Sequence, residues 1–235
     1  MKLSSLFEAN PQRDYEYRKE AQVIYNKTIN DLKKNFLYFE KRKDLSNTDE
    51  IHLLNFGDKF PQYKDLEICV GKKGAGAYFS KRKNKYIIYF DIWNEAKNSF
   101  LDEHKIKEFF IHEFIHYLDQ KRSKESSIKN TSKFWGDQQY EKYFNDPSEF
   151  NAYFQSGSKK IEDFFDRDKR YIKLWYLIEN YHKFEDFILQ HYREYFYGEG
   201  FLENINEKYK RKFLQRLYQL WIFLKNKYSI KLNRH

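Results

Sequence analysis

The chain has 235 residues, of which 40% are hydrophobic and 20% aromatic, and it carries a net charge of +9. This apolar content excludes a disordered chain, and the length fits one well-filled core. The single cysteine, Cys69, excludes an intrachain disulfide and a zinc site built from several cysteines. No apolar run is long enough for a membrane span or a secretory signal, so we expect a cytoplasmic or virion-associated protein.

The positive charge is concentrated at the C-terminal end of the chain. From Lys208 onward there are nine lysines and arginines and no acidic residue, and the other 35 basic residues balance the 35 acidic ones. The rest of the chain is formally neutral, which argues against a protein that binds nucleic acid over its whole surface. The C-terminal segment alone is a candidate for binding an anionic partner: nucleic acid, a lipid surface or an acidic protein.

The first half of the chain predicts one long helix and a small sheet. Residues 13–43 are free of Gly and Pro and predict a helix. Three short strands are predicted from Leu66, Ala77 and Lys85, separated by GKKGAG and KRKN. The segment GKKGAG lacks the Lys-Ser/Thr and the helix that follow a phosphate-binding loop, so it favours a hairpin turn.

The second half is predicted to be helical. We expect a helix over 101–122, an exposed loop at SKESSIKNTS, a helix from NDPSEFNAYF, and helices over 170–197 and 202–228 separated by Gly-Glu-Gly. This order predicts a mainly helical α+β fold with a small sheet in the N-terminal half. We expect a single domain, 1–235, made of an N-terminal helix (1–45), a catalytic core (46–157) and a helical C-terminal part (158–235).

The last predicted helix has an apolar stripe along its length. Its members recur every three or four residues: Leu202, Ile205, Tyr209, Phe213, Leu217, Leu220, Leu224 and Tyr228. Such a stripe is typical of a helix that packs on a core and leaves its lysines in water. An anionic partner is the alternative. On the preceding helix, His182 and His191 are expected to be partly buried histidines, unless one of them reaches the site described next.

The segment FFIHEFIHYLDQ combines an apolar run with two histidines four residues apart. On a helix, His112 and His116 are neighbours whose imidazoles can bind the same ion. Glu113 is rotated by about 100° from His112, too far to join them as a ligand but well placed to reach water on that ion. The H-E-x-x-H spacing therefore predicts zinc binding by the histidines, with Glu113 as the general base.

Two alternatives concern the ligands themselves. The histidine pair can be purely structural, although a chance H-E-x-x-H is expected in only about a per cent or two of such chains. Asp119 shares the polar stripe of this helix and is interpreted as a partner that orients a histidine N–H. The best third ligand is Glu149, which otherwise fits a capping box behind Asp146.

The segment from His112 to Asp119, followed by Glu149-Phe150-Asn151-Ala152, resembles the gluzincin branch of zinc metallopeptidases. It is similar in pattern to the zincin-like domains of lethal-factor-type toxins and to small peptidases of phages and mobile elements. The resemblance covers residues 85–153. It implies His112, His116 and Glu149 as zinc ligands and Glu113 as catalytic base.

The resemblance also implies a zincin-like fold and a catalytic tyrosine. The tyrosine is expected a few residues before Glu149, and Tyr143 is preferred to Tyr140. Where such domains carry an acidic support one turn after the ligand glutamate, this chain has Tyr153. The strand 85–92 is expected at the sheet edge, where an extended peptide substrate binds.

The sequence therefore predicts a zinc-dependent endopeptidase that uses Zn²⁺ and a protein or peptide substrate. Two alternatives remain. One is a basic nucleic-acid-associated or virion-associated protein with a structural zinc site. The other is a catalytically inactive interaction protein that keeps the zincin fold.

Overall fold

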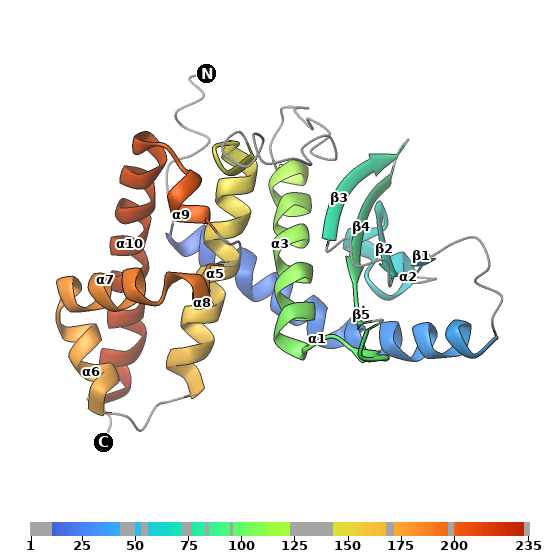
Figure 1. Ribbon diagram of the computed structural model, residues 1–235, viewed down its shortest axis with the longest axis horizontal. Coiled ribbons are helices and arrows are strands. Elements are labelled where there is room, and N and C mark those ends of the chain that lie inside the picture. The colour runs from blue at the N-terminus through green and yellow to red at the C-terminus, as the bar shows by residue number, and fades with distance from the viewer. Residues whose placement is uncertain are drawn as a thin grey trace. The chain divides into compact units, whose positions relative to one another are not determined.

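The structure is a computed structural model that describes residues 11–42, 50–52, 56–71, 77–82, 85–94, 96–122, 143–167, 172–196 and 200–232. It is mainly helical with a small sheet, which confirms the predicted α+β class (Figure 1). The chain divides into two compact units, residues 1–16 with 134–235 (unit 1) and residues 17–133 (unit 2). The border at 133/134 falls within the expected catalytic core, and the single-domain organisation stays a prediction.

Unit 2 contains a four-stranded sheet with the spatial order β1, β2, β4, β3. The strands are β1 (Glu50–His52), β2 (Leu66–Gly71), β3 (Ala77–Arg82) and β4 (Lys85–Asp91). Strands β2 and β4 are parallel, and the other two pairings are antiparallel. A second pairing joins β5 (Trp93–Asn94) to β6 (Ser99–Phe100). The three strands predicted from the sequence are confirmed.

Two topological predictions are wrong. The strands on either side of GKKGAG pair with β4 and not with each other, so this segment does not close a hairpin; residues 72–76 themselves lie outside the described residues. Strand β4 is paired on both sides, so it is not the sheet edge, and β3 ends the strand order instead. The reason is visible in its sequence, because an almost unbroken apolar run is typical of a strand that is buried on both faces.

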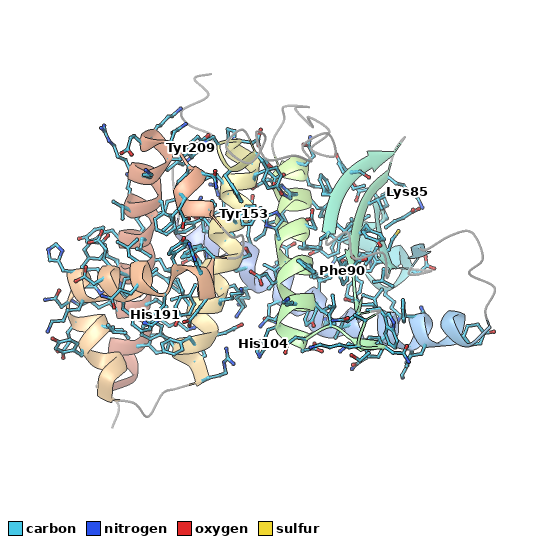
Figure 2. The ribbon with its side chains drawn as sticks, viewed as in Figure 1. Lys85, Phe90, His104, Tyr153, His191 and Tyr209 are labelled. Atoms are coloured by element: carbon cyan, nitrogen blue, oxygen red, sulfur yellow. The ribbon has the colours of Figure 1, made fainter. Side chains whose placement is uncertain are left out.

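The helix α3 (Glu103–Arg122) covers one face of this sheet. Successive side chains of a strand point to opposite faces. Phe90 of β4 is labelled in Figure 2. Its ring centroid lies 5.6 Å from that of Phe110 of α3, and the rings of Tyr86 and Tyr117 are 5.5 Å apart. On the other face, Ile87, Tyr89 and Cys69 form a separate buried cluster. The alternation along β4 thus gives α3 an aromatic surface on which to pack.

The helix α1 (Pro11–Arg42) holds the N-terminal end of α3. Its buried residues in unit 2 recur with helical spacing: Tyr17, Arg18, Ala21, Ile24, Tyr25, Thr28, Ile29, Leu32 and Phe36. The Tyr25 ring lies 5.6 Å from that of Phe110. The Tyr25 hydroxyl and the Lys33 ammonium both donate to the Glu103 carboxylate. Apolar contact and a shared carboxylate therefore fix the start of α3.

A second polar contact holds the C-terminal end of α3. Asp65, just before β2, accepts hydrogen bonds from the Tyr117 hydroxyl at 2.9 Å and from the Lys121 ammonium at 2.7 Å. Next to it, α2 (Phe56–Lys59) and the short 3-10 helix η2 (Pro61–Tyr63) pack on α3, where Tyr63 meets Phe114 edge to face. Burial alone would raise the Asp65 pKa, but the two donors hold it below its usual range.

Unit 1 consists of helices around a core rich in aromatic residues. The helices are α5 (Pro147–Arg167), α6 (Ile172–Glu179), α7 (Tyr181–Gln190), α8 (Tyr192–Tyr195), α9 (Phe201–Asn204) and α10 (Glu207–Leu232). Figure 1 shows α6 and α7 beside α10. The Phe150 ring of α5 lies 4.8 Å from Tyr209 of α10. A buried ion pair joins Arg216 of α10 to Asp14 at 2.8 Å.

The predicted helices of this unit are partly wrong in their boundaries. The helix expected over 170–197 is broken at Asn180, whose side-chain oxygen accepts from the Lys183 N–H and caps α7. The helix expected over 202–228 is interrupted between α9 and α10: α10 begins at Glu207, because the Asn206 side-chain oxygen accepts from the Tyr209 N–H. Asparagine is among the best N-cap residues, so both breaks follow from local chemistry. The expected break at Gly-Glu-Gly is supported by Gly200, whose φ is 89°.

The apolar stripe of the last helix is buried as predicted. Seven of its eight members belong to the core of unit 1, and Leu202 packs against that core: the buried seven are Ile205, Tyr209, Phe213, Leu217, Leu220, Leu224 and Tyr228. The expected loop SKESSIKNTS lies outside the described residues.

Gly157 of α5 should resist replacement by alanine. A Cβ atom built there lies 2.2 Å from Cδ1 of Phe196, which is fully buried. Glycine in a helix normally costs about 1 kcal/mol relative to alanine. We nevertheless expect Gly157→Ala to lower the free energy of unfolding by about 1–3 kcal/mol, because overpacking displaces the ring. Urea unfolding measures the change. In a Phe196→Ala background the same substitution should cost much less, and equal costs in both backgrounds would contradict the packing explanation.

The Asp65 contact should contribute stability only above acidic pH. Its folded pKa lies below the unfolded value of about 3.9, so the contribution is present above that pH and disappears as pH falls through the folded pKa. After solvent screening we expect Asp65→Asn to cost about 1 kcal/mol at pH 7 and less near pH 2.5. Urea titrations at both pH values measure this. The control Asp58→Asn changes an exposed carboxylate, and its cost in unfolding free energy should be the same at both pH values. A cost of Asp65→Asn that does not change with pH would contradict the assignment.

Candidate metal centre

The middle of α3 is buried on all sides although it carries three titratable side chains. From Phe110 to Leu118 every residue is buried, and His112, Glu113 and His116 are only 8%, 6% and 7% exposed. Burying such groups is costly unless they are paired, hydrogen-bonded or bound to a metal. The polar stripe predicted from the sequence therefore exists, and it lies in the interior of the protein.

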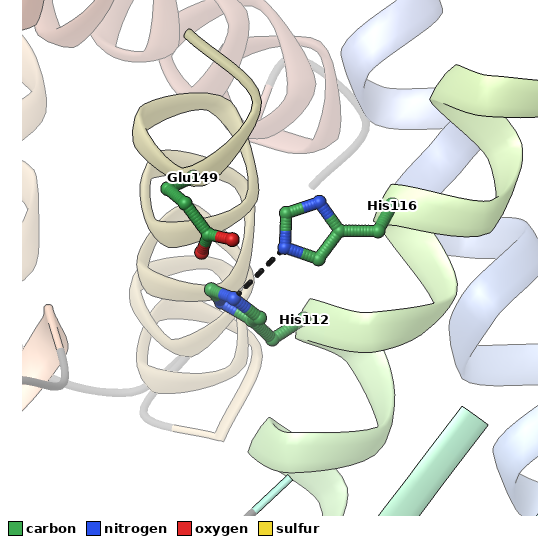
Figure 3. A group of neighbouring side chains, drawn as sticks. All are labelled: His112, His116 and Glu149. Carbon is green, nitrogen blue, oxygen red and sulfur yellow. Dashed lines mark hydrogen bonds between the residues drawn. The ribbon is translucent and has the colours of Figure 1, made fainter. Parts of the chain in front are cut away.

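The two histidines of α3 point the same ring nitrogen, Nε2, toward each other. The Nε2 atoms of His112 and His116 are 3.2 Å apart, and the ring planes are inclined by 76° (Figure 3). The Phe79 ring of β3 stacks on His116 with a centroid distance of 6.1 Å and an angle of 16°. The helix spacing brings the imidazoles together, and the aromatic neighbour restricts the orientation of one of them.

The separation of the two nitrogens fits ligands of one tetrahedral ion. With Zn–N distances of about 2.0–2.1 Å, two ligands of a tetrahedral site are about 3.3–3.4 Å apart. The observed 3.2 Å is close to that edge length. The pair can therefore accept an ion with little rearrangement of the rings.

In unit 1, Glu149 belongs to the first turn of α5 and is 2% exposed. Asp146 caps this helix: its side-chain oxygen accepts from the Ser148 N–H at 2.8 Å and from the Glu149 N–H at 3.4 Å. The capping-box alternative would use the Asp146 N–H, but that group donates to the Tyr143 carbonyl at 3.0 Å. The capping of α5 is thus accounted for by the Asp146 side chain, and the reciprocal bond of a capping box is replaced by the bond to Tyr143.

His112, His116 and Glu149 form a buried group that could hold a metal ion. Each offers one ligand atom, and these atoms lie within 4.8 Å of one another (Figure 3). Two imidazoles and a carboxylate are a donor set that suits zinc and other transition metals. The three residues predicted as metal ligands are the members of this group. That they bind a metal, and that the metal is zinc, stays a prediction.

The other predicted residues differ in how far the structure bears on them. Glu113 is buried on α3 next to His112, as the motif requires. Tyr143 is half-buried among the rings of unit 1, 6.0 Å from Tyr153 and 5.4 Å from Phe144 between ring centroids. Its role, like the orienting role of Asp119, stays a prediction. Tyr140 lies outside the described residues.

The two histidines of the α7 region take part in local surface contacts. His182 is exposed, contrary to expectation, and its Nδ1 lies 3.7 Å from the Glu185 carboxylate. His191 is half-buried, as predicted, with Nδ1 3.2 Å from the Glu194 carboxylate. Each is thus paired with an acid on its own stretch of chain.

Sequence reasoning missed the residues that support α3. Phe79 stacks on His116, and Asp65 binds Tyr117 and Lys121. The strand that contains Phe79 was predicted from its apolar residues. Which helix residue this ring would contact was not, because that depends on how the strand pairs with β4. The Asp65 contact joins residues more than 50 positions apart, and no local pattern announces it.

Within the described residues, no helix is both long enough and apolar enough to cross a membrane. Comparison of the chain with protein-family models, with curated proteins and with solved structures found no match in any of the three.

Proposed function

We propose that this protein is a zinc-dependent peptidase. The observation that carries the proposal is the pair of buried imidazoles on α3, with nitrogens 3.2 Å apart and a buried glutamate between them in the sequence. Glu149 adds a carboxylate to the same group. The arrangement combines two features that hydrolysis needs, a site for a Lewis-acidic ion and a neighbouring base.

The metal is proposed to be zinc, held by Nε2 of His112, Nε2 of His116 and a carboxylate oxygen of Glu149. Bound there, zinc would supply Lewis acidity and lower the pKa of water towards about 7. The Nε2 atoms face each other, so these are the ring atoms proposed to bind the ion.

Glu113 is proposed to move the proton. As a buried carboxylate next to a ligand histidine, it accepts a proton from the attacking water and returns it to the leaving amine. Tyr143 is proposed to donate a hydrogen bond to the oxyanion that develops on the substrate carbonyl, as the resemblance to gluzincins implies. Peptides are the proposed substrates, and the cytoplasm or a virion is the proposed location.

The number of donors favours a catalytic site over a structural one. Structural zinc sites almost always have four protein ligands, whereas catalytic sites have three and keep one position open. In the part of the chain that the structure describes, the group contains three donors. This favours the peptidase over the alternative of a protein stabilised by structural zinc.

The wild-type chain should bind one zinc ion, and each ligand should matter. Replacing an outer-shell partner typically costs 10–100-fold in metal affinity, so His116→Ala and Glu149→Gln should each weaken binding at least about 100-fold. Competition with a fluorescent zinc chelator measures the affinity, and mass spectrometry of the metal measures stoichiometry. The control His104→Ala removes an exposed histidine of the same helix and should bind zinc normally. If the wild-type protein contains no zinc after incubation with the ion, the proposed metal site is wrong.

Glu113→Gln should keep zinc and lose hydrolysis. The change preserves size but removes the proton acceptor, so kcat/KM should fall about 10²–10⁴-fold at unchanged zinc content. A fluorescence-quenched random peptide library is the substrate, with zinc content measured on the same samples. Glu108→Gln is the matched control, since it changes another buried carboxylate of α3. Hydrolysis by Glu113→Gln at the wild-type rate would contradict its role as base.

A further inference from the structure

One face of unit 1 presents aromatic rings and lysines together. It is formed by α6, α7 and α10 and is called here the aromatic–lysine face; its members are Tyr176, Tyr181, Lys183, Tyr218, Trp221 and Lys225. The Tyr181 ring meets Tyr218 and Trp221 edge to face, at centroid distances of 4.9 and 5.6 Å. Three rings from α7 and α10 therefore form one contiguous cluster.

Two rings of this face are fixed by hydrogen bonds. The Trp221 Nε1–H donates to the Ile178 carbonyl at 2.9 Å. The Tyr181 hydroxyl donates to the Leu214 carbonyl at 3.3 Å. Rings that are already held in place lose little conformational entropy when a partner binds. The face is therefore preorganised.

The exposure of this face is unusual for an amphipathic helix. Tyr176 of α6 is 55% exposed and Tyr218 of α10 is 45% exposed, and Leu214 and Ile222, four residues on either side of Tyr218, are exposed as well. The side of α10 opposite its buried stripe is expected to be polar. Contiguous exposed apolar surface usually marks a place where another molecule binds.

The cations of this face lie close to the rings. The Lys183 Nζ is 3.1 Å from the Tyr176 ring centroid, and the Lys225 Nζ is 4.9 Å from that of Trp221. Arg211 and Lys208 are exposed further along α10. One acid, Glu185, lies beside Tyr181; burial and this carboxylate raise the Tyr181 pKa to about 12. From Lys208 onward α10 carries basic residues and no acid, whereas α6 and α7 also carry the exposed acids Glu179 and Asp186.

We propose that the aromatic–lysine face binds single-stranded nucleic acid. Unpaired bases would stack on the exposed tyrosines, and phosphates would contact Lys183, Lys225 and Arg211. Proteins bind single strands with this combination of rings and cations, because every base has a flat face and every nucleotide a charge. Duplex bases have no free faces, so a duplex gains only the charge contacts. This property is separate from the proposed peptidase and does not involve its metal.

The test is fluorescence anisotropy of the full-length protein with a labelled oligodeoxythymidylate of about 15 nucleotides and with a duplex of the same length. We expect tighter binding of the single strand. Tyr218→Ala should weaken it roughly tenfold to a hundredfold, because one stacked base is lost. Lys225→Gln should lower the slope of log affinity against log salt by about 0.7, since one phosphate contact is lost.

Matched controls come from α1. Tyr38→Ala removes a tyrosine that is 51% exposed, and Lys34→Gln removes an exposed lysine; neither should change the affinity. Thermal unfolding verifies that all variants fold. Equal loss with Tyr38→Ala, or a duplex bound as tightly as the single strand, would overturn the proposal. A concentration-dependent increase in mass that Tyr218→Ala abolishes would overturn it too, because a second copy of the chain would then cover the face.

Discussion

The organising constraint of this protein is the burial of two imidazoles and a carboxylate within one turn of a helix. His112 and His116 face each other at 3.2 Å, and Glu113 is buried beside them. Such groups lose their hydration on folding and need compensation from charge, hydrogen bonds or an ion. The compensation that we propose for the two ring nitrogens is a shared metal ion. The anchors at the two ends of α3, Glu103 and Asp65, hold the helix that carries these groups.

The members of the candidate metal group could be predicted because helical periodicity and donor chemistry are local properties of a sequence. The i, i+4 spacing of the histidines becomes contact as soon as α3 forms. Glu149 required a choice between capping and ligation, and Asp146 supplies the capping of α5 through the Ser148 N–H. The α+β class followed from the order of periodic segments in the same way.

Strand order and helix ends could be predicted less well, for physical reasons. The position of β4 between β2 and β3 is decided by pairing between segments distant in the chain, and a turn-like sequence says nothing about which strands it joins. The apolar runs of β2 and β4 are typical of strands buried on both faces, which was not used to place them. The breaks at Asn180 and Asn206 arise from single side chains that accept a backbone N–H, and hydrophobic spacing continues through both positions.

Cys69 has a consequence for studying the molecule. Its thiol is completely inaccessible at the centre of β2, packed with Ile87 and Tyr89, and it is the sole cysteine of the chain. A thiol reagent can reach it only from conformations in which the side chains packed around it have moved away. The rate at which a thiol reagent modifies Cys69 in the native chain therefore reports how often this part of the core opens. The measurement needs no engineered label, and no second thiol contributes to it.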